Sequence, residues 1–282
     1  MGQQGADFSF MLVADDYAMS PSVSRGIREA LAAERLSGTG AMTNMPNWRE
    51  AARALEADGL AAKAGVHLNL TCGPSATRMA ALAPSGTLPP FRPVWKGGLT
   101  RSLPQKELVA EIKAQLDLFC DVLGRLPAFV DGHQHVQGLP QVRDTLLEEL
   151  AKRGWQGKVW LRNSADRADV ILRRGSEPVK AFSVALLSRG FAAAAGRAGF
   201  STNRGFAGFS SFDPKADYGA DFRRYLNAPG ERHLVMCHPG YADEDLAKVD
   251  PNTLSRETEL RFLLSPRFQD VLADAGGVLK PV

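Results

Sequence analysis

Short apolar segments alternate with helical segments along most of the chain, and this alternation limits the fold more than any other sequence feature. The apolar runs of strand length are residues 8–14, 63–70, 129–131, 159–161 and 233–237. Between them, residues 104–123 place Leu108, Ile112 and Leu116 four apart on one helical face. Repeated strand-then-helix units predict a mostly parallel sheet covered by helices.

The helix boundaries carry recognisable signals. Ser20 followed by Pro21 predicts a capped helix start, because Ser caps helices and Pro fits the first turn. Residues 47–50 resemble a capping box and predict a second helix, which ends near Ala57. Further helices are expected at residues 140–152, 256–264 and 266–275.

Two stretches fit the pattern less well. Residues 71–100 are rich in Pro and Gly and are expected to form a long loop, which we interpret as facing the substrate rather than as a surface excursion. Residues 165–225 combine helical stretches with Gly- and Ser-containing turns and give no clear order of elements.

The polar residues at the ends of the strands favour a closed or nearly closed barrel. In such α/β folds the carboxyl ends of the strands carry the chemistry. We therefore predict a TIM-like (β/α) barrel, and the 282 residues fit one domain that spans residues 1–282.

Composition excludes several classes of partner. The net charge is +3 without a run of Lys or Arg, which argues against nucleic acid and against an acidic membrane surface. The three cysteines are far apart and form no CxxC pair, which fits reduced thiols and a cytoplasmic location. The sequence shows neither a signal peptide nor a transmembrane segment of about 20 apolar residues, and leaves a homodimer open.

Four of the five histidines, and a pair of carboxylates, follow apolar strands. These residues are Asp15, Asp16, His67, His133, His135 and His238. Imidazole and carboxylate ligands suit Zn²⁺ and related divalent ions, and two histidines with one carboxylate leave positions open for water and substrate. The pattern predicts a catalytic centre with one divalent ion, Zn²⁺ or Mg²⁺.

Each of these residue types suggests a role. One carboxylate of the Asp15–Asp16 pair can bind the ion while the other serves as general base. His133 and His135 face the same side if the chain is extended, so one is expected to bind the ion and the other to hold the substrate or the groups behind the ligands. His238 is the natural general acid, whereas His233, at the start of a strand, is expected to be structural.

Substrate contacts are harder to assign from the sequence. Trp95 and Tyr241 could stack on a sugar ring, although core or loop packing explains each of them as well. Arg162, at the end of a strand, could hold an anionic substrate group, and a surface salt bridge is an equal alternative.

At the strand ends the sequence resembles the YdjC-like family, which includes chitooligosaccharide deacetylases and hopanoid-biosynthesis-associated members. The matching motifs are residues 13–18 (VADDYA), 65–71 (GVHLNLT), 131–136 (DGHQHV) and 238–241 (HPGY). They stand in the family's order, with Tyr17-Ala18 in place of the usual Phe-Gly and Gln137 where the family often has histidine.

The resemblance implies a TIM-like barrel with an incomplete strand count and one divalent metal ion. It also implies that Asp16, His67 and His133 are the metal ligands and that Asp15 is the base, as in related polysaccharide deacetylases. His238 is the acid by a looser analogy.

Together these observations predict a metal-dependent carbohydrate N-deacetylase that acts on an N-acetylated sugar, oligosaccharide or glycolipid. Two alternatives stay open. The same ligands could serve another metal-dependent hydrolase such as a phosphoesterase, and the barrel could be a non-catalytic binding protein.

Overall fold

A single curled sheet forms the centre of the molecule in a computed structural model that describes residues 8–282. All its strand pairs are parallel. Along the sheet the strands are β5 (Trp160–Leu161), β4 (Phe129–Gly132), β3 (Ala64–Leu68), β2 (Gly38–Ala41), β1 (Phe8–Tyr17), β7 (His233–Cys237) and β6 (Phe206–Ala207), while β8 (Gly277–Leu279) pairs with the start of β1.

The edge strands of the sheet are β5 and β6, and the segment that precedes β6 links them. Thr202 forms a bridge with Leu161 of β5, and the Leu161 amide donates to the Ser201 carbonyl at 2.9 Å. The Asn203 side chain binds the backbone of Asn163 on the same edge. The predicted TIM-like barrel with fewer than eight strands on its path is therefore confirmed.

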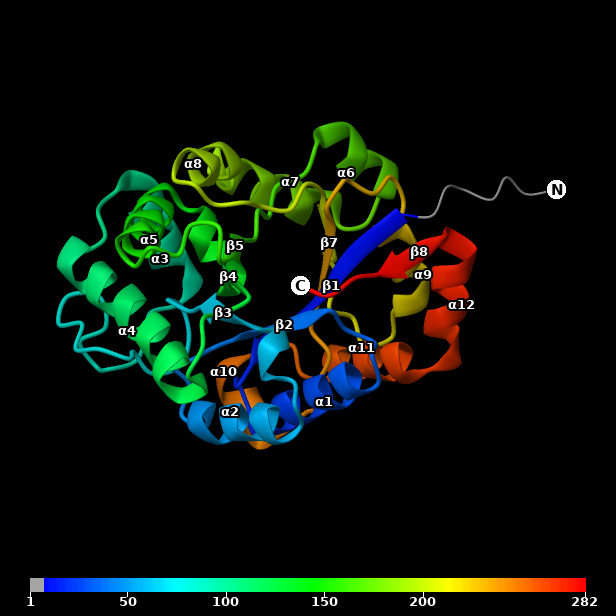
Figure 1. The fold of residues 1–282 in the computed structure, drawn as a ribbon, viewed down its shortest axis with the longest axis horizontal. Helices are drawn as coiled ribbons and strands as arrows, with labels where there is room; N and C mark the ends of the chain where they lie inside the picture. The colour runs from blue at the N-terminus through cyan, green and yellow to red at the C-terminus, as the bar shows by residue number, and fades with distance from the viewer. Residues whose placement is uncertain (1–7) are drawn as a thin grey trace.

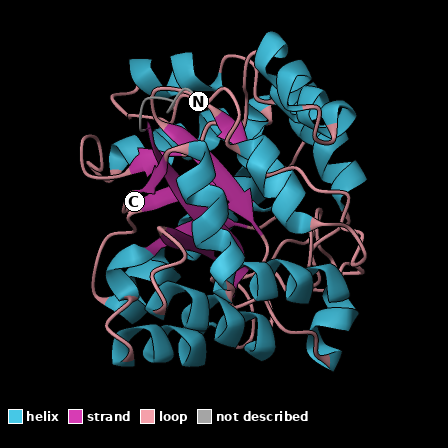
Figure 2. Cartoon of the chain, turned by 90° about the vertical axis from the view of Figure 1, so that its right-hand side faces the viewer, coloured by secondary structure: helices cyan, strands magenta, loops and turns pink. Residues whose placement is uncertain are grey.

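Helices surround this sheet, as Figures 1 and 2 show. The α-helices are α1 (Pro21–Ala32), α2 (Trp48–Ala57), α3 (Phe91–Thr100), α4 (Gln105–Leu123), α5 (Pro140–Lys152), α6 (Ala168–Arg174), α7 (Pro178–Leu187), α8 (Phe191–Arg197), α9 (Tyr218–Tyr225), α10 (Glu244–Val249), α11 (Leu254–Leu264) and α12 (Pro266–Ala275). Two 3₁₀ helices, η1 (Ala61–Lys63) and η2 (His133–Gly138), complete the set.

The predicted helix signals are borne out in part. Ser20 caps α1, its hydroxyl accepting from the Val23 amide at 3.2 Å, and Pro21 begins the helix. Asn47 precedes α2 but its side chain makes no capping hydrogen bond, so the predicted capping box is wrong. Gly124 ends α4 with φ of 59°, a conformation that glycine adopts without steric cost.

The stretch expected to be a loop at residues 71–100 is partly helical, because α3 occupies its last ten residues. Two carboxylates of α4 order the first half. Glu111 accepts from the amides of Ala76 and Thr77, and Glu107 accepts from those of Ala81 and Leu82.

The inner strands are buried along their length. Every residue of β3, β4 and β7 is buried, as expected for parallel strands with side chains packed on both faces. This packing fixes the level at which each strand ends, and with it the position of the polar residues that follow.

Among residues 8–282, one segment is long and apolar enough to cross a membrane by length and composition. It is Pro178–Arg197, with a mean hydropathy of 1.2, and the sequence reading did not single it out. In the structure it comprises two helices, α7 and α8, which are separated at Gly190.

Close approach of β3 to β4 depends on Gly65. A Cβ atom at this position would lie 2.6 Å from the Phe129 carbonyl oxygen and 2.7 Å from the Phe129 ring. We expect Gly65→Ala to lower the free energy of unfolding by about 1–3 kcal/mol, because the strands must separate to admit the methyl group. Thermal unfolding followed by circular dichroism measures this.

Gly196→Ala is the matched control, because a Cβ atom there meets nothing within 4 Å and the residue lies within α8. This variant should be as stable as the parent or slightly more stable. An equal melting temperature for Gly65→Ala and the parent would contradict the tight packing at the two strands.

Candidate metal centre and active site

The carboxyl ends of five neighbouring strands deliver one group of charged side chains to the same end of the barrel. Asp15 and Asp16 end β1, His67 is in β3, and Asp131 is in β4. The remaining members follow directly after their strands: His133 after β4, Arg162 after β5 and His238 after β7. The convergence predicted from the strand ends is therefore present in the fold.

An irregularity in β1 turns both of its carboxylates toward this group. The pairing of β1 with β2 shifts register between Ala14 and Tyr17, and Asp16 has φ of 70°, in the left-handed region. Such a conformation is unfavourable for a residue other than glycine and is concentrated at functional sites. As a result the adjacent side chains of Asp15 and Asp16 both approach the His67 ring, at 3.9 and 3.4 Å from Nε2.

Asp16, His67 and His133 form a set of potential metal ligands. Their ligand atoms lie within 4.8 Å of one another. Asp16 Oδ1 lies 2.9 Å from His133 Nδ1 and 3.4 Å from His67 Nε2. One carboxylate oxygen and two imidazole nitrogens that face a common point are the donor set of a catalytic Zn²⁺ or similar divalent ion.

Asp131 fixes the orientation of the His67 ring. The two residues are direct partners in the register of β3 and β4, and His67 Nδ1 lies 2.6 Å from Asp131 Oδ1. Because Nδ1 donates to this carboxylate, Nε2 is the nitrogen that faces Asp16. A carboxylate behind a histidine is the usual arrangement around protein metal sites, so the residues present fit a divalent ion.

A second acidic set, Asp15, His67 and Asp131, also has its donor atoms close together. It fits a cation less well, because the Arg162 guanidinium already lies 2.6 Å from Asp15 Oδ1 and 3.1 Å from Asp131 Oδ2. A metal ion among these three residues would face that buried positive charge. We therefore favour the set that contains Asp16 and His133.

Arg162 holds Asp15 through both carboxylate oxygens. Its two terminal nitrogens lie 2.6 and 3.0 Å from Asp15 Oδ1 and Oδ2, and the Arg162 side chain is fully buried. Burial raises the pKa of Asp15, but Arg162 and His67 outweigh it and lower the pKa overall. Asp15 is thus an ionised, fixed carboxylate.

Arg256 of α11 holds the other half of Asp16. Its NH2 group lies 2.6 Å from Asp16 Oδ2 and 2.5 Å from Asp250 Oδ2. Burial raises the pKa of Asp16, whereas Arg256 and His133 lower it well below its ordinary value. Oδ1 is left to face the two histidines.

His238 follows β7 and Arg162 follows β5, and these two strands lie on opposite sides of β1 in the sheet. His238 Nε2 lies 3.9 Å from Asp15 Oδ2. The His238 amide donates to Glu259 Oε2 at 2.6 Å, and the Phe212 ring packs edge-on against the imidazole at 5.2 Å. These contacts hold His238 beside Asp15.

The structure places the remaining predicted residues differently. The chain from His133 to His135 is not extended, since Gln134 and His135 have φ of 52° and 60°, so the expected extended geometry is wrong. The His135 ring packs edge-on against Phe206 and Phe209, both at 5.7 Å. Burial and Arg162 lower the pKa of His135 well below its ordinary value, which keeps the ring neutral.

The other expected substrate contacts are Arg162, Tyr241 and Trp95. Arg162 and Tyr241 are bound to side chains of the chain itself. Arg162 forms buried ion pairs with Asp15 and Asp131. It therefore forms neither the surface salt bridge nor the contact with an anionic substrate group that the sequence suggested. Tyr241 donates to Glu29 at 2.6 Å, and Arg25 lies over its ring at 4.4 Å, so it packs on α1. Trp95 is on α3, with 39% of its surface exposed.

His233 is buried inside the chain, as expected for a structural residue. Its Nε2 lies 2.9 Å from the Tyr225 carbonyl, and burial together with Arg174 lowers its pKa to about 4. A neutral ring donates to the carbonyl from Nε2, so the residue satisfies a buried backbone group.

Sequence reasoning did not assign roles to Asp131, Arg256 and Glu259. Asp131 follows an apolar strand and shows the same signal as the residues that were assigned. Arg256 and Glu259 lie three apart on α11 among buried Leu260 and Leu263. Charged residues at helical spacing on an apolar face were the available signal.

Comparison with known proteins shows which family the chain matches. The model of the family described as YdjC-like protein matches residues 9–274. A chitooligosaccharide deacetylase from Citrobacter koseri is 31% identical over 267 residues, which is 93% of each chain. A protein of the same name from Salmonella paratyphi B is 29% identical over 270 residues, again with 93% of each chain covered.

One solved structure shares the whole fold. A protein from Enterococcus faecalis, provisionally named a cellobiose-phosphate cleavage protein, superposes with a TM-score of 0.71 at 21% identity. The match covers 98% of both chains. It shows that the incomplete barrel is an established architecture.

Protons would compete with a metal ion for His67 and His133, the two histidines of the candidate ligand set. Burial lowers the pKa of His67, but Asp131 and Asp15 raise it to about 9. Burial also lowers the pKa of His133, which Asp16 raises well above its ordinary value. Below these values an incoming ion must displace protons, so the affinity for Zn²⁺ should rise by about tenfold or more per pH unit from about pH 6 to pH 9.

Competition with a chromophoric chelator measures this affinity. His67→Gln should weaken Zn²⁺ binding at least about 100-fold and remove part of the pH dependence. His135→Gln, the same change two residues beyond a ligand, should leave the affinity nearly unchanged. An affinity that is independent of pH in the parent protein would contradict the proposed ligands.

Proposed function

The chain belongs to the YdjC-like family, and from this premise we propose that it is a metal-dependent carbohydrate N-deacetylase. The substrate is an N-acetylated sugar, oligosaccharide or glycolipid, and the products are acetate and a free amine. The observation that carries the proposal is the buried set of Asp16, His67 and His133 beside an ionised Asp15. The names of the curated relatives support the choice of an acetamide as the scissile group.

Asp15 is positioned to act as general base. Its lowered pKa keeps it ionised at neutral pH, and Arg162 prevents its carboxylate from rotating. It accepts a proton from the attacking water as the new C–O bond forms. The ion, when bound by Asp16, His67 and His133, supplies the Lewis acid that polarises the acetamide carbonyl and stabilises negative charge on its oxygen.

His238 is positioned to act as general acid. Its Nε2 lies 3.9 Å from Asp15 Oδ2, so the acid and the base of the reaction would stand side by side. A proton on Nε2 passes to the leaving nitrogen as the C–N bond breaks. Glu259 and Phe212 fix the ring for this transfer.

His135 and Trp95 are our candidates for contacts with the sugar. Neutral His135 lies on the wall formed with Phe206 and Phe209, two residues after the ligand His133. Trp95 presents an exposed ring on α3, which packs on the η2 segment that carries both histidines. Aromatic faces of this kind stack on the apolar face of a sugar.

The adjacent carboxylates allow a matched test. Asp15→Asn should reduce kcat for acetate release from N-acetylglucosamine oligomers by about 10²–10⁴-fold while the protein still binds one equivalent of Zn²⁺. Asp16→Asn, the same change one residue on, should lose the ion and the activity together. Chelator should abolish acetate release by the parent protein.

Two outcomes would overturn this assignment. Acetate release that is insensitive to chelator would remove the ion from the reaction. Hydrolysis of nitrophenyl phosphate but of no acetamide would place the protein among the phosphoesterases.

A further inference from the structure

Helix α7 is mostly apolar, yet four of its ten residues, Val179, Lys180, Ser183 and Leu186, are exposed. Lys180 and Ser183 are the polar side chains of the sequence PVKAFSVALL, and Ala181 is its buried residue. A helix that is apolar on all sides normally lies in a protein core or in a membrane. The most apolar long segment of residues 8–282, which contains α7, is only 28% buried.

The most exposed large apolar side chains in residues 8–282 lie on α7 and the neighbouring α6. They are Val179, Leu186 and Leu172, with exposed fractions of 79%, 70% and 65%. Val179 and Leu186 are seven residues apart and therefore share a face of α7. Figure 1 shows both helices along one flank of the molecule, at the top of the view. We call the surface of α6 and α7 that carries these three residues the apolar flank.

Positive charge surrounds the apolar flank. Residues 167–197 contain six Lys and Arg against two Asp and Glu. Without Arg174, which is buried and paired with Asp166, their net charge is +3, equal to that of the whole chain. Arg173, Arg189 and Arg197 are exposed at the ends of α6, α7 and α8. The small net charge of the whole chain argued against an acidic membrane surface. It does not show that these basic residues are gathered in one segment.

The geometry of α7 suits a helix that lies on a bilayer and not one that crosses it. Its ten residues span about 15 Å, half of the hydrocarbon core of about 30 Å. The chain breaks at Gly190, with φ of 79°, before α8 begins. Exposed apolar side chains next to Lys and Arg suit the boundary between acyl chains and anionic headgroups.

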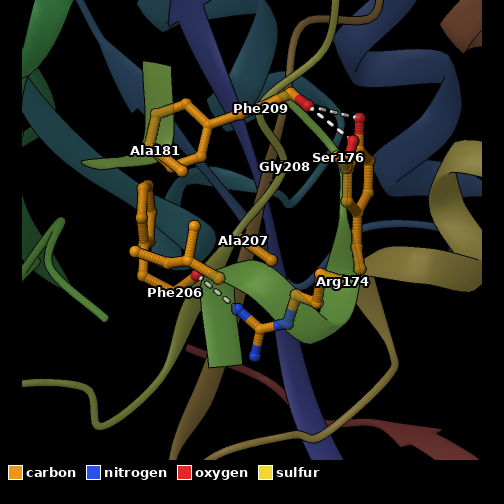
Figure 3. A pocket seen from close by; sticks show the side chains of 9 residues that line it. Arg174, Ser176, Ala181, Phe206, Ala207, Gly208 and Phe209 are labelled. Atoms are coloured by element: carbon orange, nitrogen blue, oxygen red, sulfur yellow. Dashed lines mark hydrogen bonds between the residues drawn. The ribbon is translucent and has the colours of Figure 1, made fainter. Parts of the chain in front are cut away.

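The inner face of α7 adjoins the wall of the candidate active site. Figure 3 shows Ala181 beside Phe206 and Phe209 in a small pocket under the helix. The same two aromatic rings pack against His135. A helix seated on a bilayer would therefore bring the mouth of the site close to the lipid headgroups.

A second contact joins α7 to the proposed acid. Lys180 donates to the Ser210 carbonyl at 2.8 Å and lies 5.3 Å from the centre of the Phe212 ring. Phe212 in turn packs on His238. The helix is thus tied to residues 206–212, a segment that packs against both His135 and His238.

We propose that the apolar flank docks on the surface of a bilayer that contains anionic lipid. Val179, Leu186 and Leu172 enter the region between headgroups and acyl chains, and the surrounding arginines pair with lipid phosphates. This binding goes beyond the deacetylase function and does not rest on it, because it needs no substrate.

A second copy of the chain fits this surface less well. A symmetric dimer through the apolar flank would bring two rims of net charge +3 together, and like charges across an interface are unfavourable. An anionic surface provides the complementary charge instead.

Flotation with vesicles tests the proposal on the full chain. The parent protein should bind vesicles of phosphatidylcholine with about one-third phosphatidylglycerol and bind pure phosphatidylcholine more weakly, and high salt should reduce binding. The double variant Val179→Ser with Leu186→Ser should lose about tenfold or more of its binding. Arg173→Gln with Arg189→Gln should lose the preference for anionic vesicles.

Val278→Ser is the matched control, since Val278 is 53% exposed on β8, outside the apolar flank. It should bind vesicles like the parent protein. The double serine variant should keep the parent's melting temperature and its Zn²⁺ affinity, which separates loss of docking from loss of fold or of the metal centre.

Two results would overturn the proposal. One is vesicle binding that is absent in the parent protein or unchanged in the double serine variant. The other is a dimer in solution that the same two substitutions dissociate without any binding to lipid.

Discussion

A buried network of carboxylates, guanidinium groups and imidazoles at the carboxyl ends of the strands determines the geometry of the centre. Arg162 joins Asp15 to Asp131, and Asp131 orients His67. Asp16 then meets His67 with one oxygen and Arg256 with the other. Buried charges are tolerated only when they are paired, so loss of one partner costs roughly 3–5 kcal/mol. The same ion pairs that stabilise these buried charges leave Asp16 Oδ1 close to His67 Nε2 and His133 Nδ1.

The barrel supplies this network with fixed positions. Parallel strands end at the same level, and the register of β3 with β4 sets His67 directly beside Asp131. The left-handed conformation of Asp16 adds what a regular strand cannot, because neighbouring side chains of a strand point to opposite faces. Base and ligand can therefore be adjacent in sequence and still act on one substrate. Helix α7 contacts η2 and the segment after β6, so docking through the apolar flank would bring the centre near the bilayer.

Much of this arrangement could be predicted from the sequence, for a definite reason. Apolar runs that end in Asp or His mark the carboxyl ends of parallel strands, and these ends meet, so the acids and histidines that follow the strands could be grouped without coordinates. The choice of Asp16, His67 and His133 within that group came from the resemblance to the family. Features that depend on local backbone or on distant partners could not. The left-handed turn redirects His135, and Arg162 finds its carboxylates only in the folded chain. The exposed face of α7 was equally hidden, because periodicity cannot show that an apolar helix is left uncovered.

The central claim is that Asp16, His67 and His133 bind one ion, and an anomalous difference map at the zinc edge tests it most directly. Crystals of the protein grown with Zn²⁺ should give one strong peak about 2.0–2.2 Å from Asp16 Oδ1, His67 Nε2 and His133 Nδ1. A peak between Asp15 and Asp131, or no peak at the ends of the strands, would contradict the account.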